Sequence, residues 1–130
     1  MRPLHCEPML ISKLFRAGFV LALVAILAIA LMPAAQAPIV FASDKLNHIL
    51  AFFVLAAGGR IAWPQLNGAV LVGLLSAYGG LIEILQWEMG YGRDADWRDF
   101  LADVIAILAG MAVGHAFLRL FEQEGTPAET

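Results

Sequence analysis

Cysteine and charge are both scarce in this chain, and each scarcity excludes a class of protein. The single cysteine, Cys6, precedes the first long apolar run, so no disulfide framework can form and a spectator thiol is expected. Charged residues make up only 15% of the chain and its net charge is −3. Nucleic-acid binding needs a clustered basic surface, so we expect no nucleic-acid partner. The zinc-binding pattern HExxH is absent, and we assign no metal ligands and no cofactor from the sequence.

Apolar residues are correspondingly abundant in this chain. The chain has 130 residues and 61% of them are hydrophobic, whereas a soluble domain is about half apolar. An excess of this size favours a membrane protein, and the length allows one domain with a handful of spans. We therefore predict an all-α membrane protein, a bundle of about four transmembrane helices in contact with membrane lipids.

The first apolar run follows a basic segment over residues 1–16. Ala17–Met32 carries no charge, which is typical of either a first transmembrane helix or a signal peptide. The tripeptide Ala35-Gln36-Ala37 resembles a cleavage site, but Pro38 directly after it disfavours cleavage, and the apolar run is long for a signal peptide. We favour a retained helix that ends near Ala35.

Three more helices are expected along the rest of the chain. They cover about 44–63, 66–87 and 96–121. The residues between the second and third, Pro64-Gln65-Leu66-Asn67, form a tight turn, so these two helices should be antiparallel neighbours. The predicted bundle thus spans 17–121 and is followed by a polar tail over 122–130.

Lysine and arginine divide unevenly between the two ends of the predicted bundle. One end has Arg2, Lys13, Arg16, Arg60 and Arg119, and the other has Lys45, Arg93 and Arg98. Cytoplasmic segments carry the excess of positive charge. Both termini are therefore predicted to be cytoplasmic, in a multi-pass protein of the inner (plasma) membrane.

Small residues recur on the last predicted helix. Ala106, Gly110 and Gly114 lie four residues apart, which lets helix backbones approach closely. We favour packing within the chain over a homodimer seam, and the oligomeric state is left open.

Polar residues of three predicted helices fall at one depth, near the outer end. They pair by spacings of three or four residues as Asp44 with His48, Glu83 with Gln86, and Asp99 with Asp103. Such spacings place each pair on one helical face. Nothing comparable is found in the inner half of the predicted bundle.

Glu83 is the hardest of these residues to explain structurally. It lies near a helix C-terminus, where a carboxylate opposes the helix dipole. His48 lies about one turn inside the membrane boundary and could shuttle protons if it faces Glu83. Asp103 is a turn deeper than Asp99 and should face the bundle interior, because charge in lipid is costly. Asp99 and Asp44 can also serve as helix caps.

The same residues form a pattern that resembles the VanZ-like family of small membrane proteins. The matching segments are Asp44-Lys45-Leu46-Asn47-His48, then Tyr78-Gly79-Gly80-Leu81-Ile82-Glu83-Ile84-Leu85-Gln86, then Arg93 with Trp97 and Asp99. The family pattern reads approximately DKxxH, (Y/F)GxxxExxQ and R…D…N, and the likeness covers about residues 44–114. This chain has Asp103 and Ala106 where the family usually has Asn and then Gly.

The resemblance implies an integral membrane protein of the cell envelope. The family takes its name from a determinant of glycopeptide (teicoplanin) resistance, and its biochemical activity is largely undefined. The resemblance thus supports a fold and a set of residues more than a reaction.

Three hypotheses for function remain open. In the first, a polar pocket near the outer leaflet binds or acts on an envelope component, such as a lipid-linked or glycopeptide-like molecule. Its substrate contacts would be Asp44, Lys45, Gln86, Arg93 and Asp103.

In the second hypothesis, the chain is an enzyme. His48 and Glu83 would be the acid–base pair, and Asp99 would orient the imidazole or help to hold a metal. In the third, the polar residues form a structural network that fixes the bundle, for instance for a partner protein.

Overall fold

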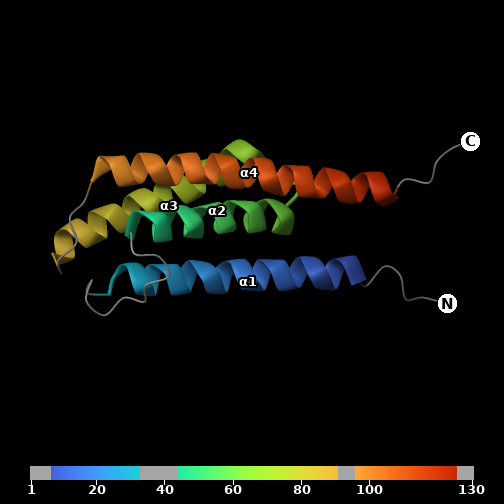
Figure 1. Ribbon diagram of the computed structural model, residues 1–130. Helices are drawn as coiled ribbons and strands as arrows, with labels where there is room; N and C mark the ends of the chain where they lie inside the picture. The colour runs from blue at the N-terminus through green and yellow to red at the C-terminus, as the bar shows by residue number, and fades with distance from the viewer. Residues whose placement is uncertain (1–6, 33–43, 91–95, 126–130) are drawn as a thin grey trace, which may run out of the picture.

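A computed structural model describes residues 7–32, 44–90 and 96–125 of the chain (Figure 1). These residues form four α-helices: α1 (Glu7–Ala30), α2 (Asp44–Ala62), α3 (Gly68–Met89) and α4 (Trp97–Gly125). Within the described ranges there is no β-strand. The predicted all-α fold class is confirmed.

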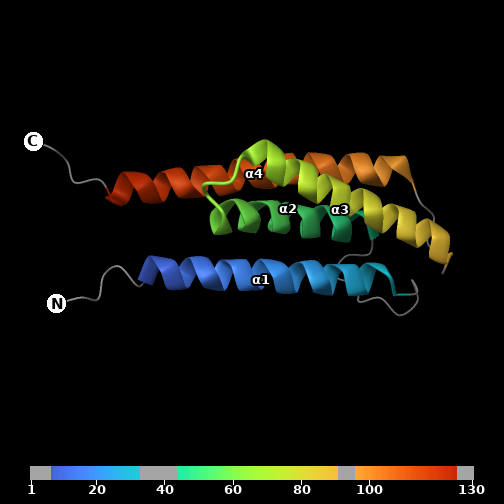
Figure 2. The ribbon, with the colours of Figure 1, turned by 180° about the vertical axis from the view of Figure 1, so that it is seen from behind.

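Helix α2 is the central element of the bundle. It packs against all three other helices, and its contact with α4 is the most extensive between any two. Figures 1 and 2 show α1 and α4 on opposite sides of α2, with α3 running obliquely beside α2 and α4. The first turns of α2 and α4 lie with the last turns of α1 and α3, and we call this the His48 end. The opposite end, with the α2–α3 turn, is the Trp63 end.

The surface of the bundle is predominantly apolar. Three segments are long and apolar enough to cross a membrane: Leu10–Ala30, Gly68–Met89 and Trp97–Phe121. Large hydrophobic side chains on these helices point outward, such as Leu21, Leu74 and Ile105, each more than half exposed. A soluble protein rarely exposes so much contiguous apolar surface, so the chain is membrane-embedded.

The core consists of aliphatic and aromatic side chains from all four helices. Its buried members are Ala30, Phe52, Leu55, Ala56, Leu71, Leu75, Ile82, Ala106 and Ile107. On α2 these residues recur at spacings of three and four, so one face of that helix is buried along its length.

Glycines on α4 allow the close contact with α2. A Cβ on Gly110 would lie 2.3 Å from the backbone oxygen of Phe53, and a Cβ on Gly114 would lie 2.9 Å from that of Ala57. Only glycine fits at such a backbone approach. The prediction that these small residues pack within the chain is confirmed.

Helix α1 covers Glu7–Ala30, so it begins ten residues before the predicted start at Ala17 and ends five before the predicted end near Ala35. Its basic segment is held against the C-terminus of α2, where helix carbonyls lack partners of their own. The Arg16 Nε–H group donates to the Ala62 oxygen over 3.0 Å, and the guanidinium lies 5.6 Å from the Trp63 ring centroid. The basic residues therefore extend the helix rather than preceding it.

The turn between α2 and α3 is short, as predicted, and makes these helices antiparallel neighbours. Arg60 donates from Nη1 to the oxygens of Pro64 and Leu66, at 3.0 and 2.9 Å. Asn67 caps α3 by accepting from the N–H group of Ala69. At the far end, Gly90 closes α3 in the left-handed conformation with a φ of 67°.

Helix α4 continues to Gly125, beyond the predicted end near Phe121. The first residues of the predicted polar tail, 122–125, are thus helical. The reason is local, since this stretch contains no proline that would stop the helix.

Candidate functional site

Three polar side chains, one each from α2, α3 and α4, reach the bundle interior because each lies on the helix face that also carries the core residues. His48 lies four residues before the fully buried Phe52 on α2. Asp103 lies four before the fully buried Ile107 on α4. Glu83 follows buried Ile82 on α3 and precedes buried Gln86 by three. Residues three or four apart share a helical face, so the faces that form the core also bring these groups inward.

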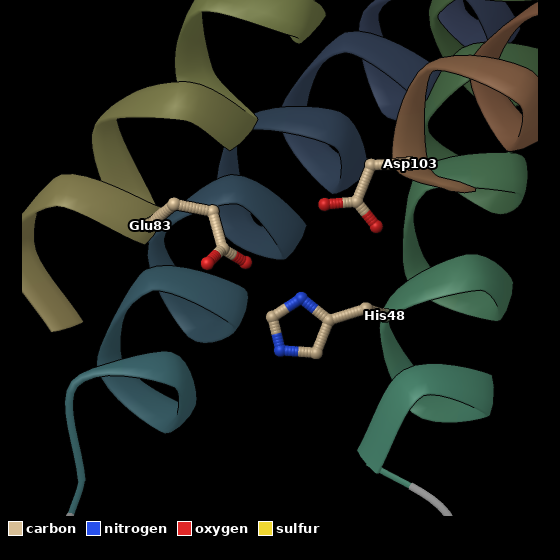
Figure 3. A group of neighbouring side chains, drawn as sticks. All are labelled: His48, Glu83 and Asp103. Carbon is tan, nitrogen blue, oxygen red and sulfur yellow. The ribbon is translucent and has the colours of Figure 1, made fainter. Parts of the chain in front are cut away.

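His48, Glu83 and Asp103 meet near the His48 end and form what we call the buried centre (Figure 3). One ligand atom from each, an imidazole nitrogen and two carboxylate oxygens, lies within 4.8 Å of the others. In Figure 3 the two carboxylates point toward each other from α3 and α4, and one nitrogen of His48 faces the gap between them. The three groups come from three different helices.

The three residues lie at a similar depth. His48 is four residues inside the start of α2, Asp103 is six inside the start of α4, and Glu83 is six before the end of α3. At a rise of about 1.5 Å per residue, these offsets amount to about 6–9 Å along the helices. The buried centre is therefore below the His48 end but within reach of it.

Asp103 is the most buried member of the buried centre. Its side chain is 2% exposed, and neither of its carboxylate oxygens has a hydrogen-bond partner among the described residues. A buried ionised carboxylate without compensation costs several kcal/mol, so such groups are normally paired or bound to a metal. Asp103 thus needs a positive charge or a proton at the centre.

Lys45 and Asp99 form a rim above the buried centre, one helical turn closer to the His48 end. The Lys45 Nζ atom lies 3.6 Å from Asp99 Oδ1, and both side chains are partly exposed. Asp96 caps α4, because its Oδ1 atom accepts from the N–H group of Arg98 over 2.9 Å. The rim therefore offers one partly exposed ammonium group above the centre.

Apolar groups form a floor beneath the buried centre. Phe52 and Tyr78 make an edge-to-face contact with ring centroids 6.1 Å apart, and Ile82 and Ile107 are buried beside the same core. The Tyr78 hydroxyl donates its hydrogen bond to the Leu23 oxygen on α1 and not to a carboxylate of the centre. The floor separates the centre from the Trp63 end.

The structure brings together only some of the predicted site residues. His48 and Glu83 lie together with Asp103, which was predicted as a substrate contact. Asp99, which was predicted as their catalytic partner, is paired with Lys45 instead. Gln86 donates from Nε2 to the Ala30 oxygen over 3.0 Å and so fastens α3 to α1.

Two more residues, Asp44 and Arg93, were also predicted as substrate contacts. Asp44 begins α2, but its side chain is outside the described part of the structure, and Arg93 is outside the described residues. Their roles stay predictions, as do the catalytic roles of His48, Glu83 and Asp99.

Gly79 is a site residue that the sequence reasoning missed. A Cβ there would lie 3.1 Å from Phe52 Cζ and 3.7 Å from Asp103 Oδ2. Glycine therefore leaves room for the Phe52 ring of α2 against α3, one turn from Glu83. The available signal was the spacing of four between Gly79 and Glu83, which places both on one face.

Comparison of the chain with protein-family models, curated proteins and solved structures found no match.

Proposed function

We propose that this chain is a VanZ-like integral membrane protein of the cell envelope that binds or acts on an envelope component at the buried centre. All four helices would cross the inner (plasma) membrane, with the His48 end toward the outer leaflet and both termini cytoplasmic. The orientation is supported by Lys13, Arg16, Arg60 and Arg119, which are near the Trp63 end of their helices, against Lys45 and Arg98 at the other end.

The observation that carries the proposal is the convergence of His48, Glu83 and Asp103 from three helices, with ligand atoms within 4.8 Å of one another. Ionisable groups inside a membrane bundle are costly and are usually kept for function. Two of these residues, His48 and Glu83, lie in the segments that resemble the VanZ-like family. Asp103, the third residue, stands where the family usually has Asn, so the convergence of all three residues is particular to this chain.

The chemistry of the site suits a ligand with an anionic or amide group. The Lys45 side chain at the rim is 47% exposed, and its ammonium group can contact a phosphate of a lipid-linked molecule. Beneath it, His48 and Glu83 can transfer a proton to or from a bound group, because imidazole and carboxylate serve as acid–base catalysts. We infer that the ligand enters at the outer leaflet, since the apolar floor closes the other side.

The purely structural hypothesis is less well supported. In a hydrogen-bond network that only fixes the bundle, each buried polar atom should have a partner. Both oxygens of Asp103 lack one among the described residues. A buried carboxylate without hydrogen-bond partners is better suited to binding a ligand than to holding helices together.

The proposal is tested by variants of the buried centre in cells that depend on the protein. Glu83→Gln and His48→Ala should abolish the contribution of the protein to survival in teicoplanin or a related glycopeptide. Glu88→Gln and His115→Ala are matched controls, because Glu88 and His115 are exposed and away from the centre. Membrane abundance of each variant is measured in parallel by immunoblot. Unchanged susceptibility in both centre variants at normal abundance would refute the proposal.

A further inference from the structure

Asp103 gives the reason to look for a cation at the buried centre. It is 2% exposed and both oxygens lack a hydrogen-bond partner among the described residues. Glu83, only 9% exposed, brings a second carboxylate to within 4.8 Å. Two carboxylates so close together repel unless a positive charge or a shared proton is held between them. The Lys45 ammonium group is paired with Asp99 at the rim instead.

The donor set identifies the kind of cation. One imidazole nitrogen and two carboxylate oxygens suit zinc, manganese and related divalent transition ions. Calcium prefers six to eight oxygen ligands, and magnesium rarely uses imidazole, so both fit the set less well.

The spacing is also compatible with metal binding. Ligand atoms about 2.0–2.2 Å from a tetrahedral zinc ion are about 3.4 Å from one another. The groups of the buried centre are at most 4.8 Å apart. The ligand atoms therefore need to move by only about 1 Å to reach that separation, a shift within the range of small changes in side-chain torsion angles.

We propose that His48, Glu83 and Asp103 bind one divalent transition-metal ion of the zinc or manganese class. Three protein ligands from three helices leave at least one coordination position for water or for a ligand. The inference deepens the proposed function and rests on it for the role of the ion, which is to bind the phosphate or amide oxygen of the envelope molecule. Binding of the ion itself does not depend on that role.

The test uses the full chain, purified in detergent and freed of metal with a chelator. Titration with ZnCl₂ and with MnCl₂, followed by calorimetry, should give saturable binding of one ion per chain for at least one of the two. MgCl₂ should bind much more weakly. Titration with CoCl₂ gives a second readout, because visible absorption bands report nitrogen and oxygen ligands in a site of low coordination number.

Variants assign the ion to the three residues. Asp103→Asn, Glu83→Gln and His48→Ala should each weaken binding by about 100-fold or more, since even loss of a residue that only orients a ligand costs about 10–100-fold. Glu88→Gln and His115→Ala should bind like the wild type. Asp103→Asn removes a buried charge, so it should fold at least as well as the metal-free wild type, which circular dichroism can check.

Two results would overturn the inference. The first is the absence of saturable binding of zinc or manganese to the wild type. The second is binding that survives unchanged in Asp103→Asn and Glu83→Gln, which would place the ion elsewhere on the protein. If the wild type binds no ion and the centre variants still lose resistance, the proposed function stands without the metal. If the ion binds and resistance does not depend on the centre, the metal site stands without the proposed function.

Discussion

Substitution of Gly110 by alanine tests whether the close packing of α2 and α4 positions the buried centre. The new Cβ would lie 2.3 Å from the Phe53 oxygen and 2.9 Å from Ala56 Cβ. Carbon–oxygen contacts in packed helices are about 3.3–3.6 Å, so the two helices must separate by about 1 Å at this point. A backbone oxygen cannot rotate out of the way as a side chain can.

The expected loss of stability follows from two opposing terms. Overpacking of a core position costs about 1–3 kcal/mol, and contact with rigid backbone favours the upper part of that range. Alanine is a better helix former than glycine by about 1 kcal/mol. We therefore expect Gly110→Ala to lower the free energy of unfolding by about 2 kcal/mol. Asp103 lies two turns away on the same face, so metal binding should weaken as well.

The assay is unfolding in mixed detergent micelles, followed by circular dichroism. Gly58→Ala on α2 is the matched control, because a Cβ at Gly58 meets nothing within 4 Å. That variant should be unchanged or gain up to about 1 kcal/mol from helix propensity. If Gly110→Ala is as stable as Gly58→Ala, the helices are not in contact at Phe53 and the geometry of the buried centre must be different.

Two further substitutions test the surroundings of the buried centre. Tyr78→Phe keeps the ring against Phe52 but removes the hydroxyl that donates to the Leu23 oxygen, so the free energy of unfolding should fall by about 1 kcal/mol in the same assay. No loss would show that α1 is not held at this point. Lys45→Met should change stability by less than about 1 kcal/mol, because its ion pair with Asp99 is partly exposed. It should nevertheless weaken binding of vesicles rich in anionic lipid, and unchanged binding would exclude Lys45 as an anion contact.

The elements of the fold could be predicted because their signals are local. Apolar runs long enough to cross a membrane indicate helices, and the turn after Trp63 follows from four consecutive residues. The limits of α1 could not be predicted in the same way. Its extension to Glu7 is accompanied by contacts between Arg16 and the far end of α2, and such long-range contacts leave no local signal.

The depth of the site in the bundle could be predicted from the sequence, but the set of residues that form it could not. Spacing places Asp99 and Asp103 on one face of α4, one turn apart, and either could have met His48. The choice is made by the close approach of α2 and α4 at Gly110 and Gly114, which places Asp103 in the interior and leaves Asp99 at the rim. That approach depends on how two helices pack, and a single sequence does not specify which side of α4 faces α2.

The position of the buried centre within the bundle favours a one-sided site over a transport path. Below the centre, the interior consists of Phe52, Leu75 and Ile107, whose side chains are at most 2% exposed. A carrier must open its site to each side of the membrane in turn, and here the inward route would require these packed side chains to separate. On the outward side, the described residues above the centre include Lys45 and Asp99, whose partly exposed ion pair contributes little to stability. Exchange of ligand, proton or metal ion is therefore expected at the His48 end, which we propose faces the outer leaflet.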